Sequence, residues 1–243
     1  MPRPKIIKAV AALCNLKDET CARVRDSKFN RLEYYEGEIE LVKCKIDHVH
    51  TNTTKFDHEC GHSIRDIAEH ELQIYDSEID TLVQDGGEVT LYHGAEVSDL
   101  CVNKSSTNIK GEARVKHAVV TVRGGLWVAH GYVRKVNVWG WMTTCERGII
   151  NFAEIQKGGK FVSGYRYTDR TSVPVVHQLL ARSGSAVKFR GDCAVGELRI
   201  AKDVKVEIQS GSMLFLGRLY IDGKQVTKNL TTWINDHTHP VVC

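Results

Sequence analysis

The chain has 243 residues, 42% of them hydrophobic, and a formal net charge of +3. This apolar content is enough for a continuous core and excludes an intrinsically disordered chain. No run of 18 apolar residues occurs, so no membrane-spanning helix is expected, and Lys8 interrupts the apolar N-terminal run before it reaches the length of a secretion signal. The eight cysteines are scattered, which favours reduced thiols. The localisation stays open, and a reducing compartment or a phage or surface particle would fit.

Residues 1–31 are predicted to form a basic N-terminal cap. Pro4 suits the first turn of a helix, and Ile6, Val10 and Leu13 follow at helical spacing. A short amphipathic helix here would cover the open end of a repeat array, whose first repeat otherwise exposes core and unpaired strand edges. A flexible basic leader is the alternative.

Residues 48–62 contain the most chemically suggestive cluster. Five potential metal ligands occur there: His48, His50, His58, Cys60 and His62. Alternate residues of a strand point to the same face, and imidazole and thiolate are good ligands for zinc. The spacing matches no standard zinc finger or ribbon, so a polar outer strand face is the alternative to a zinc or other transition-metal site. No other cofactor is expected.

The clearest repeat lies between residues 86 and 140. A glycine pair precedes apolar-x-apolar, and a single glycine then precedes apolar-x-x-apolar-x-apolar. Val97, Val115 and Val133 occupy equivalent positions at equal intervals along the chain. A fixed period near 20 residues, built from β-branched residues and glycines, is typical of a solenoid whose coils bury their inward faces against one another.

This pattern resembles the degenerate glycine-rich repeat of AIDA-type autotransporter adhesins. Two copies are well preserved, at residues 86–106 and 124–141. The resemblance implies an all-β fold, a single right-handed parallel β-solenoid used as a stalk or adhesive surface. We expect the solenoid to extend over residues 32–226, with residues 227–243 as a C-terminal cap or tail. The repeat carries no catalytic residues, so none are assigned.

An aromatic and basic insertion follows the clear repeats, at residues 163–176. It contains Tyr165, Arg166, Tyr167 and Arg170. Insertions in solenoids collect on one face and often carry binding, and tyrosine and arginine are common in patches that bind sugars or anions. These residues are therefore the predicted binding patch, with an ordinary surface loop as the alternative.

Charge is unevenly distributed along the chain. Residues 32–99 contain four Lys/Arg against seventeen Asp/Glu, whereas residues 100–243 contain twenty-one against ten. In a solenoid this would separate charge along the axis, which favours self-association or binding of an anionic polymer. Drift in the composition of solvated faces is the alternative.

The sequence therefore favours a structural or adhesive solenoid, a fibre, stalk or surface-binding module that recognises a glycan or a protein. One alternative is a polysaccharide-cleaving β-helix enzyme, with Asp76, Asp80 and Asp99 as candidate acids. Another is a binder of an anionic polymer through the basic C-terminal half. The absence of GxSxG, P-loop, dinucleotide-binding and HExxH motifs argues against the common hydrolase, nucleotide-binding and zincin classes.

Overall fold

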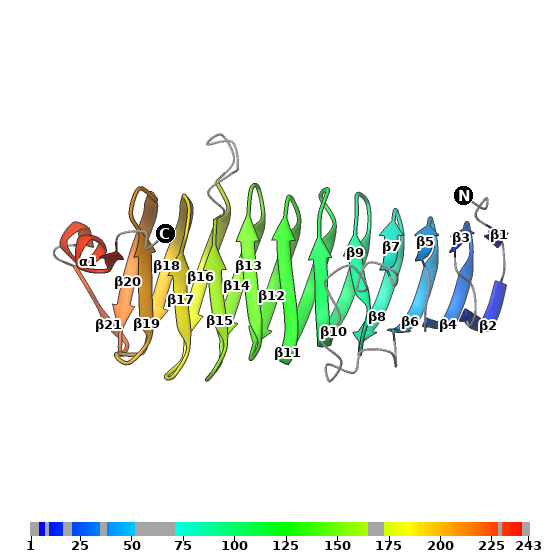
Figure 1. Ribbon diagram of the computed structural model, residues 1–243, viewed down its shortest axis with the longest axis horizontal. Helices are drawn as coiled ribbons and strands as arrows, with labels where there is room; N and C mark the ends of the chain where they lie inside the picture. Colours follow the sequence, from blue (N-terminus) through cyan, green and yellow to red (C-terminus); the bar gives the residue numbers. More distant parts are fainter. Residues whose placement is uncertain are drawn as a thin grey trace, which may run out of the picture.

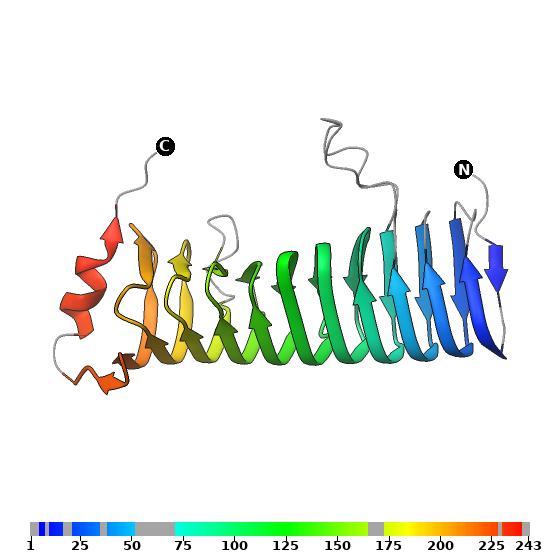
Figure 2. The ribbon, with the colours of Figure 1, turned by 90° about the horizontal axis from the view of Figure 1, so that it is seen from below.

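The computed structural model of the chain describes residues 5–7, 10–16, 21–34, 38–51, 71–164, 173–227 and 230–239. Within these residues the chain forms a parallel β-solenoid, as predicted, and position in the sequence maps onto position along the long axis (Figures 1 and 2). The described helix is too short to cross a membrane, and none of the described residues form a helix that could do so.

Each coil contributes one strand to each of two parallel stacks, which we call sheet A and sheet B. Sheet A contains, in axial order, β2 (Val10–Leu16), β4 (Lys28–Tyr34), β6 (Lys45–Thr51), β8 (Glu78–Gln84), the first parts of β10 (Glu96–Ile109) and β11 (Arg114–Ala129), β12 (Tyr132–Val138), β14 (Ile149–Ile155), β16 (Val175–Ala181), β18 (Cys193–Ile200) and β20 (Leu214–Ile221). Sheet B contains β1 (Lys5–Ile7), β3 (Cys21–Arg25), β5 (Glu38–Val42), β7 (Glu71–Tyr75), β9 (Glu88–Leu91), the second parts of β10 and β11, β13 (Trp141–Cys145), β15 (Lys160–Ser163), β17 (Ala186–Phe189), β19 (Lys205–Gln209) and β22 (Thr238–His239). The short strand β21 (Lys224–Gln225) pairs antiparallel with the end of β20.

The repeated apolar-x-x-apolar-x-apolar pattern follows from a bend within each strand of sheet A. In β10, Val97, Leu100 and Val102 are all buried. Side chains of a regular strand alternate between faces, so two inward side chains at odd spacing, such as Val97 and Leu100, require a bend between them. The pairing registers of β10 with both neighbours omit Ser98, which lies at that bend.

Equivalent core residues stack along the axis, as the equal intervals in the sequence predict. Val97 pairs with Val115, and Val115 pairs with Val133. All three side chains are buried, as are Val136 and Val138 in β12. The buried residues form one continuous hydrophobic cluster that runs from Val24 to Leu219.

The N-terminal capping helix predicted from Ile6, Val10 and Leu13 is wrong. Residues Lys5–Ile7 and Val10–Leu16 are strands, and they pair in parallel with β3 and β4. The edges of β3 and β4 offer backbone hydrogen-bond partners to this segment, and tertiary pairing overrides a weak local helical spacing. The solenoid therefore begins before residue 32.

The helix that the structure describes is at the opposite end. Helix α1 (Leu230–Asp236) lies across the C-terminal end of the stack (Figures 1 and 2). Its side chains Leu230, Trp233 and Ile234 are partly buried against the hydrophobic core. An amphipathic helix in this position covers apolar surface that the last coil would otherwise expose.

Candidate functional site

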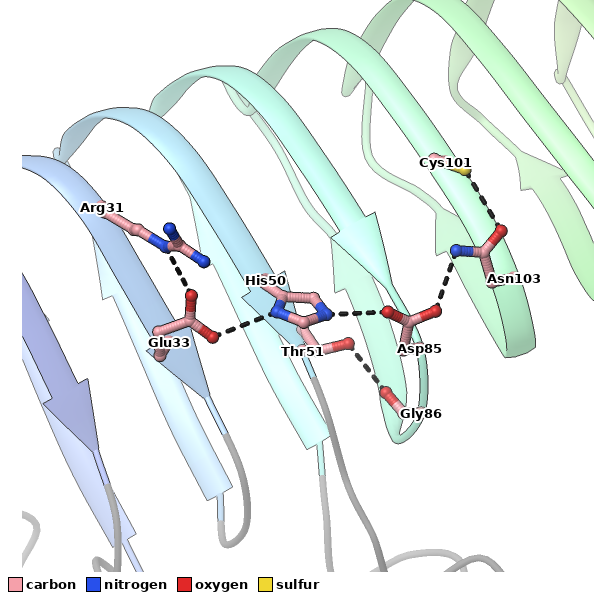
Figure 3. Close-up of polar contacts among 8 residues, drawn as sticks. All are labelled: Arg31, Glu33, His50, Thr51, Asp85, Gly86, Cys101 and Asn103. Carbon is pink, nitrogen blue, oxygen red and sulfur yellow. Dashed lines mark hydrogen bonds and ion pairs between the residues drawn. The ribbon is translucent and has the colours of Figure 1, made fainter.

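A connected group of polar side chains crosses the outer face of sheet A in the N-terminal half of the solenoid (Figure 3). We call it the His50 network, and its members are Arg31 and Glu33 from β4, His50 from β6, Asp85 directly after β8, and Cys101 and Asn103 from β10. Glu33 and His50 are direct partners in the pairing of β4 with β6. Adjacent strands lie about 4.8 Å apart, so polar side chains in register on neighbouring coils are within hydrogen-bonding reach.

His50 is clamped between two carboxylates from the coils on either side of it. Its Nδ1 atom lies 3.1 Å from Oε2 of Glu33, and its Nε2 atom lies 2.7 Å from Oδ2 of Asp85. An ionised carboxylate can only accept hydrogen bonds, whereas an imidazolium donates at both nitrogens. The doubly protonated ring therefore satisfies both contacts at once.

The remaining carboxylate oxygens also have partners. Arg31 Nε donates to Oε1 of Glu33 at 2.5 Å, and Asn103 Nδ2 donates to Oδ1 of Asp85 at 2.8 Å. Glu33 is only 7% exposed, so its charge needs this compensation from Arg31 and His50. Each oxygen of both carboxylates therefore accepts a hydrogen bond within the network.

The pKa shifts in the network agree with this geometry. Burial alone would raise the pKa of Asp85, but the hydrogen bonds from His50 and Asn103 and the charges of His50 and Lys104 outweigh it and lower the pKa below its ordinary value. Burial and the nearby charge of Asp85 raise the pKa of Cys101. Its thiol is therefore protonated at neutral pH and donates to Oδ1 of Asn103, with 3.3 Å between the two atoms.

This arrangement joins neighbouring coils, and it engages both ring nitrogens of His50 within the protein. A general base needs a nitrogen that can reach a substrate proton, and both nitrogens of His50 are engaged within the protein. A cysteine nucleophile or metal ligand must be a thiolate, which the raised pKa of Cys101 disfavours. The imidazole, the carboxylates and the thiol of the network are thus engaged in hydrogen bonds that connect neighbouring coils.

The network lies where the chain departs furthest from its period. Ile46 of β6 pairs with Ile79 of β8, and the stretch of sequence between them is much longer than that between Val97 and Val115, because the segment between β6 and β7 is long. Two further hydrogen bonds connect the end of β6 with the residues that follow β8. Thr51 Oγ1 donates to the carbonyl of Gly86 at 2.8 Å, and the Asp85 amide donates to the carbonyl of Thr51 at 2.8 Å. The polar contacts thus hold two coils in register across an interruption of the repeat.

The predicted metal ligands are only partly within the described residues. His48 and His50 both lie on the outer face of β6, whereas His58, Cys60 and His62 lie outside the described residues. Within the part of the chain that the structure describes, no three histidine, cysteine or acidic side chains are arranged to hold a metal ion. A zinc site at this cluster therefore stays a prediction.

The predicted binding patch, Tyr165, Arg166, Tyr167 and Arg170, also lies outside the described residues and stays a prediction. The candidate acids do not form one constellation. Asp76 lies at a corner between sheets B and A, whereas Asp80 and Asp99 lie on the outer face of sheet A. All three are exposed, and Oδ1 of Asp99 lies 3.2 Å from Nδ1 of His117.

The partners of His50 were missed in the sequence, although a signal for them exists. Glu33 and His50 are separated by 17 residues, and Asp85 and Asn103 by 18, which are both close to the coil period. Polar residues that recur at that period are candidates for contact between coils.

Comparisons of the chain with protein-family models, with curated proteins and with solved structures find no match. The coil repeat that carries the resemblance to AIDA-type adhesins is confirmed, but no family match supports that family. Inference about function rests on the geometry of the solenoid itself.

Proposed function

We propose that this chain is a rigid structural solenoid that presents its outer face to an extended partner, as a stalk or surface-binding module. The observation that carries the proposal is the closed bonding of the His50 network. Its histidine and both carboxylates are fully engaged with one another across three coils, so they stiffen the rod and are not poised to react.

The repetition of the coils supports a partner that is itself linear. Outer side chains recur in register along the axis at the strand spacing of about 4.8 Å. Solenoids of this kind offer extended surfaces because position along the sequence becomes position along the rod. A glycan, a protein or a second copy of the chain would fit such a surface.

A second candidate, the binding of an anionic polymer, is favoured by one specific surface. Arg114, Lys116, Arg134 and Lys135 are exposed on neighbouring strands of the outer face of sheet A. Binding of this kind would weaken steeply as salt rises, because it depends on the release of counterions. A surface-binding module for a neutral partner would respond much less to salt.

The test is to incubate the purified full chain with insoluble cellulose and chitin and with soluble heparin, and to measure both binding and new reducing or unsaturated ends. Binding of a polymer or of a second copy without bond cleavage is the expected result. Cleavage products would overturn the proposal, and so would a chain that binds no polymer and no second copy. The variant His50→Gln should lower stability and leave the binding of the folded protein unchanged.

A further inference from the structure

The outer face of sheet A changes its charge between β10 and β11, two neighbouring strands along the axis (Figure 1). On β8 and the first part of β10, the outward residues include no lysine or arginine, and the acidic ones are Glu78, Asp80, Glu96 and Asp99. On the first part of β11 and on β12, the outward residues include no acid, and the basic ones are Arg114, Lys116, Arg134 and Lys135. All eight side chains are exposed, so an acidic and a basic surface lie side by side on one face.

Strand register arranges these charges in rows that run along the solenoid axis. In the first row, Glu96 pairs with Glu78 on one side and with Arg114 on the other. The second row lies two residues further along each strand, and its members are Asp80, Ser98, Lys116 and Arg134. In both rows the acidic members precede the boundary between β10 and β11, and the basic members follow it.

Several of these charges have no opposite charge to pair with in their own chain. Glu78 pairs with Lys45 at 3.0 Å, and Asp99 lies 3.2 Å from His117. In the part of the chain that the structure describes, no salt bridge involves Asp80, Glu96, Arg114 or Arg134. These exposed groups are therefore available to opposite charges on another molecule.

A twofold rotation turns this face into its own complement. If the rotation axis is parallel to the strands and lies between β10 and β11, the rotation exchanges the positions of β10 and β11, and of β8 and β12, and keeps each position along the strands. Glu96 of one copy then faces Arg114 of the other copy, and Asp80 faces Arg134. A twofold axis parallel to the solenoid axis would instead place acidic strands against acidic strands, which like-charge repulsion disfavours.

We infer that the outer face of sheet A is the interface of a twofold-symmetric dimer of antiparallel solenoids, in which β8 and β10 of each copy contact β11 and β12 of the other. Val119, which is 36% exposed on the same face of β11, adds apolar area beside the twofold axis. The boundary lies near the middle of sheet A, with β2, β4, β6, β8 and β10 before it and β11, β12, β14, β16, β18 and β20 after it, so antiparallel copies overlap along most of their length. Single exposed ion pairs are weak and screened by salt, so the dimer depends on several of them together.

The inference rests on the proposed function and identifies its extended partner as a second copy of the chain. Its test is sedimentation equilibrium of the full chain at about 0.1 M and about 1 M salt, where the screening length is about 10 Å and about 3 Å. We expect a monomer–dimer equilibrium at the lower salt concentration. Its dissociation constant should rise by about tenfold or more at the higher salt concentration.

Charge reversal tests the surface itself. Arg134→Glu places a carboxylate opposite Asp80 of the other copy, and Asp80→Arg places a guanidinium group opposite Arg134. Each contact occurs twice in a symmetric dimer, so each variant should weaken dimerisation by about thirtyfold. The double variant restores the attraction and should dimerise about as well as the original chain.

Lys160→Glu is the matched control, because it makes the same change in net charge at an exposed residue on the outer face of sheet B. It should leave the dissociation constant unchanged, and all variants should keep the circular dichroism spectrum of the original chain. Equal weakening by Arg134→Glu and Lys160→Glu, or a double variant that stays monomeric, overturns the inference. A monomeric chain that binds heparin, cellulose or chitin without cleaving it also overturns the inference but leaves the proposed function standing, whereas a monomer that binds none of them overturns both.

Discussion

Asp85 accepts a hydrogen bond from His50 at 2.7 Å across 35 residues of sequence. The two residues lie on neighbouring coils, on either side of the long segment between strands β6 and β7. Because Glu33 holds the other nitrogen of the same ring at 3.1 Å, three coils are joined through one imidazole.

His50→Ala should destabilise the solenoid by about 2 kcal/mol, because it leaves the buried carboxylate of Glu33 without its second partner. Urea unfolding followed by circular dichroism measures this. The matched control is His117→Ala: the side chain of His117 is 55% exposed and pairs with an exposed Asp99, so its removal should change stability little. Equal effects of the two substitutions would contradict a special role for His50.

The contribution of Asp85 to stability should depend on pH in a defined direction. Its pKa is lowered in the folded state from the ordinary value of 3.8. A carboxyl group of this kind stabilises the fold above its unfolded pKa, and the contribution is lost as pH falls through the folded pKa. The melting temperature of the original chain should therefore exceed that of Asp85→Asn at neutral pH, and the difference should shrink below pH 3.8. A difference in melting temperature that grows as the pH falls would contradict the lowered pKa of Asp85.

Val136→Asp should prevent stable folding, because it places an unpaired charge at a fully buried position, at a cost of several kcal/mol. Val122→Asp makes the same chemical change at a side chain that is 76% exposed and should be nearly neutral. Circular dichroism melting curves compare them. A folded Val136→Asp chain would be inconsistent with the observed core.

Gly94→Ala and Gly158→Ala separate backbone strain from crowding between coils. Both glycines have positive φ, 74° and 82°, so alanine at either position should cost about 1 kcal/mol in strain. A Cβ atom at position 94 would also displace the carboxylate of Asp76 and lie 3.1 Å from the Cα atom of Asp76, whereas nothing lies within 4 Å at position 158. Gly94→Ala should therefore be the more destabilising in urea unfolding, and a larger effect at Gly158 would contradict the packing at this corner.

Self-association should occur at low salt and disappear at high salt. Residues 32–99 carry four basic against seventeen acidic residues and residues 100–243 twenty-one against ten, and the described strands of these two segments follow one another along the axis of the solenoid (Figure 1). Acidic and basic coils of different copies then attract one another until salt shortens the screening length, which is about 8 Å at physiological ionic strength. Sedimentation velocity at two salt concentrations measures this. A chain that is monomeric at both would contradict the prediction and favour drift in the composition of solvated faces as the origin of the uneven charge.

Much of the fold was predictable because its signal is local and repeated. Val97, Leu100 and Val102 and their equivalents in the next coils mark the inward face of every clear coil, and burial of that face is the main driving force for stacking. The N-terminal strands were not predicted, although Ala11, Cys14 and Leu16 carry the same spacing and pair with Phe29, Leu32 and Tyr34. A short apolar segment fits helical and strand periods equally, and only the neighbouring strand edge decides between them.

The sequence by itself determined the architecture of this protein, because a solenoid is specified by a pattern that each coil repeats. Only the tertiary structure decided which polar residues meet. His50 was recognised as a chemically capable residue, but Glu33 and Asp85 are 17 and 35 residues from it, and their approach depends on the register of β6 against β8 across a long interruption. Likewise, Asn108, Trp127 and Glu146 come from three coils, and stacking alone places them around one depression. The period of the coils can be recognised from the spacing of residues in the sequence. Contacts between coils depend in addition on the register of the paired strands, and every residue between them helps to set that register.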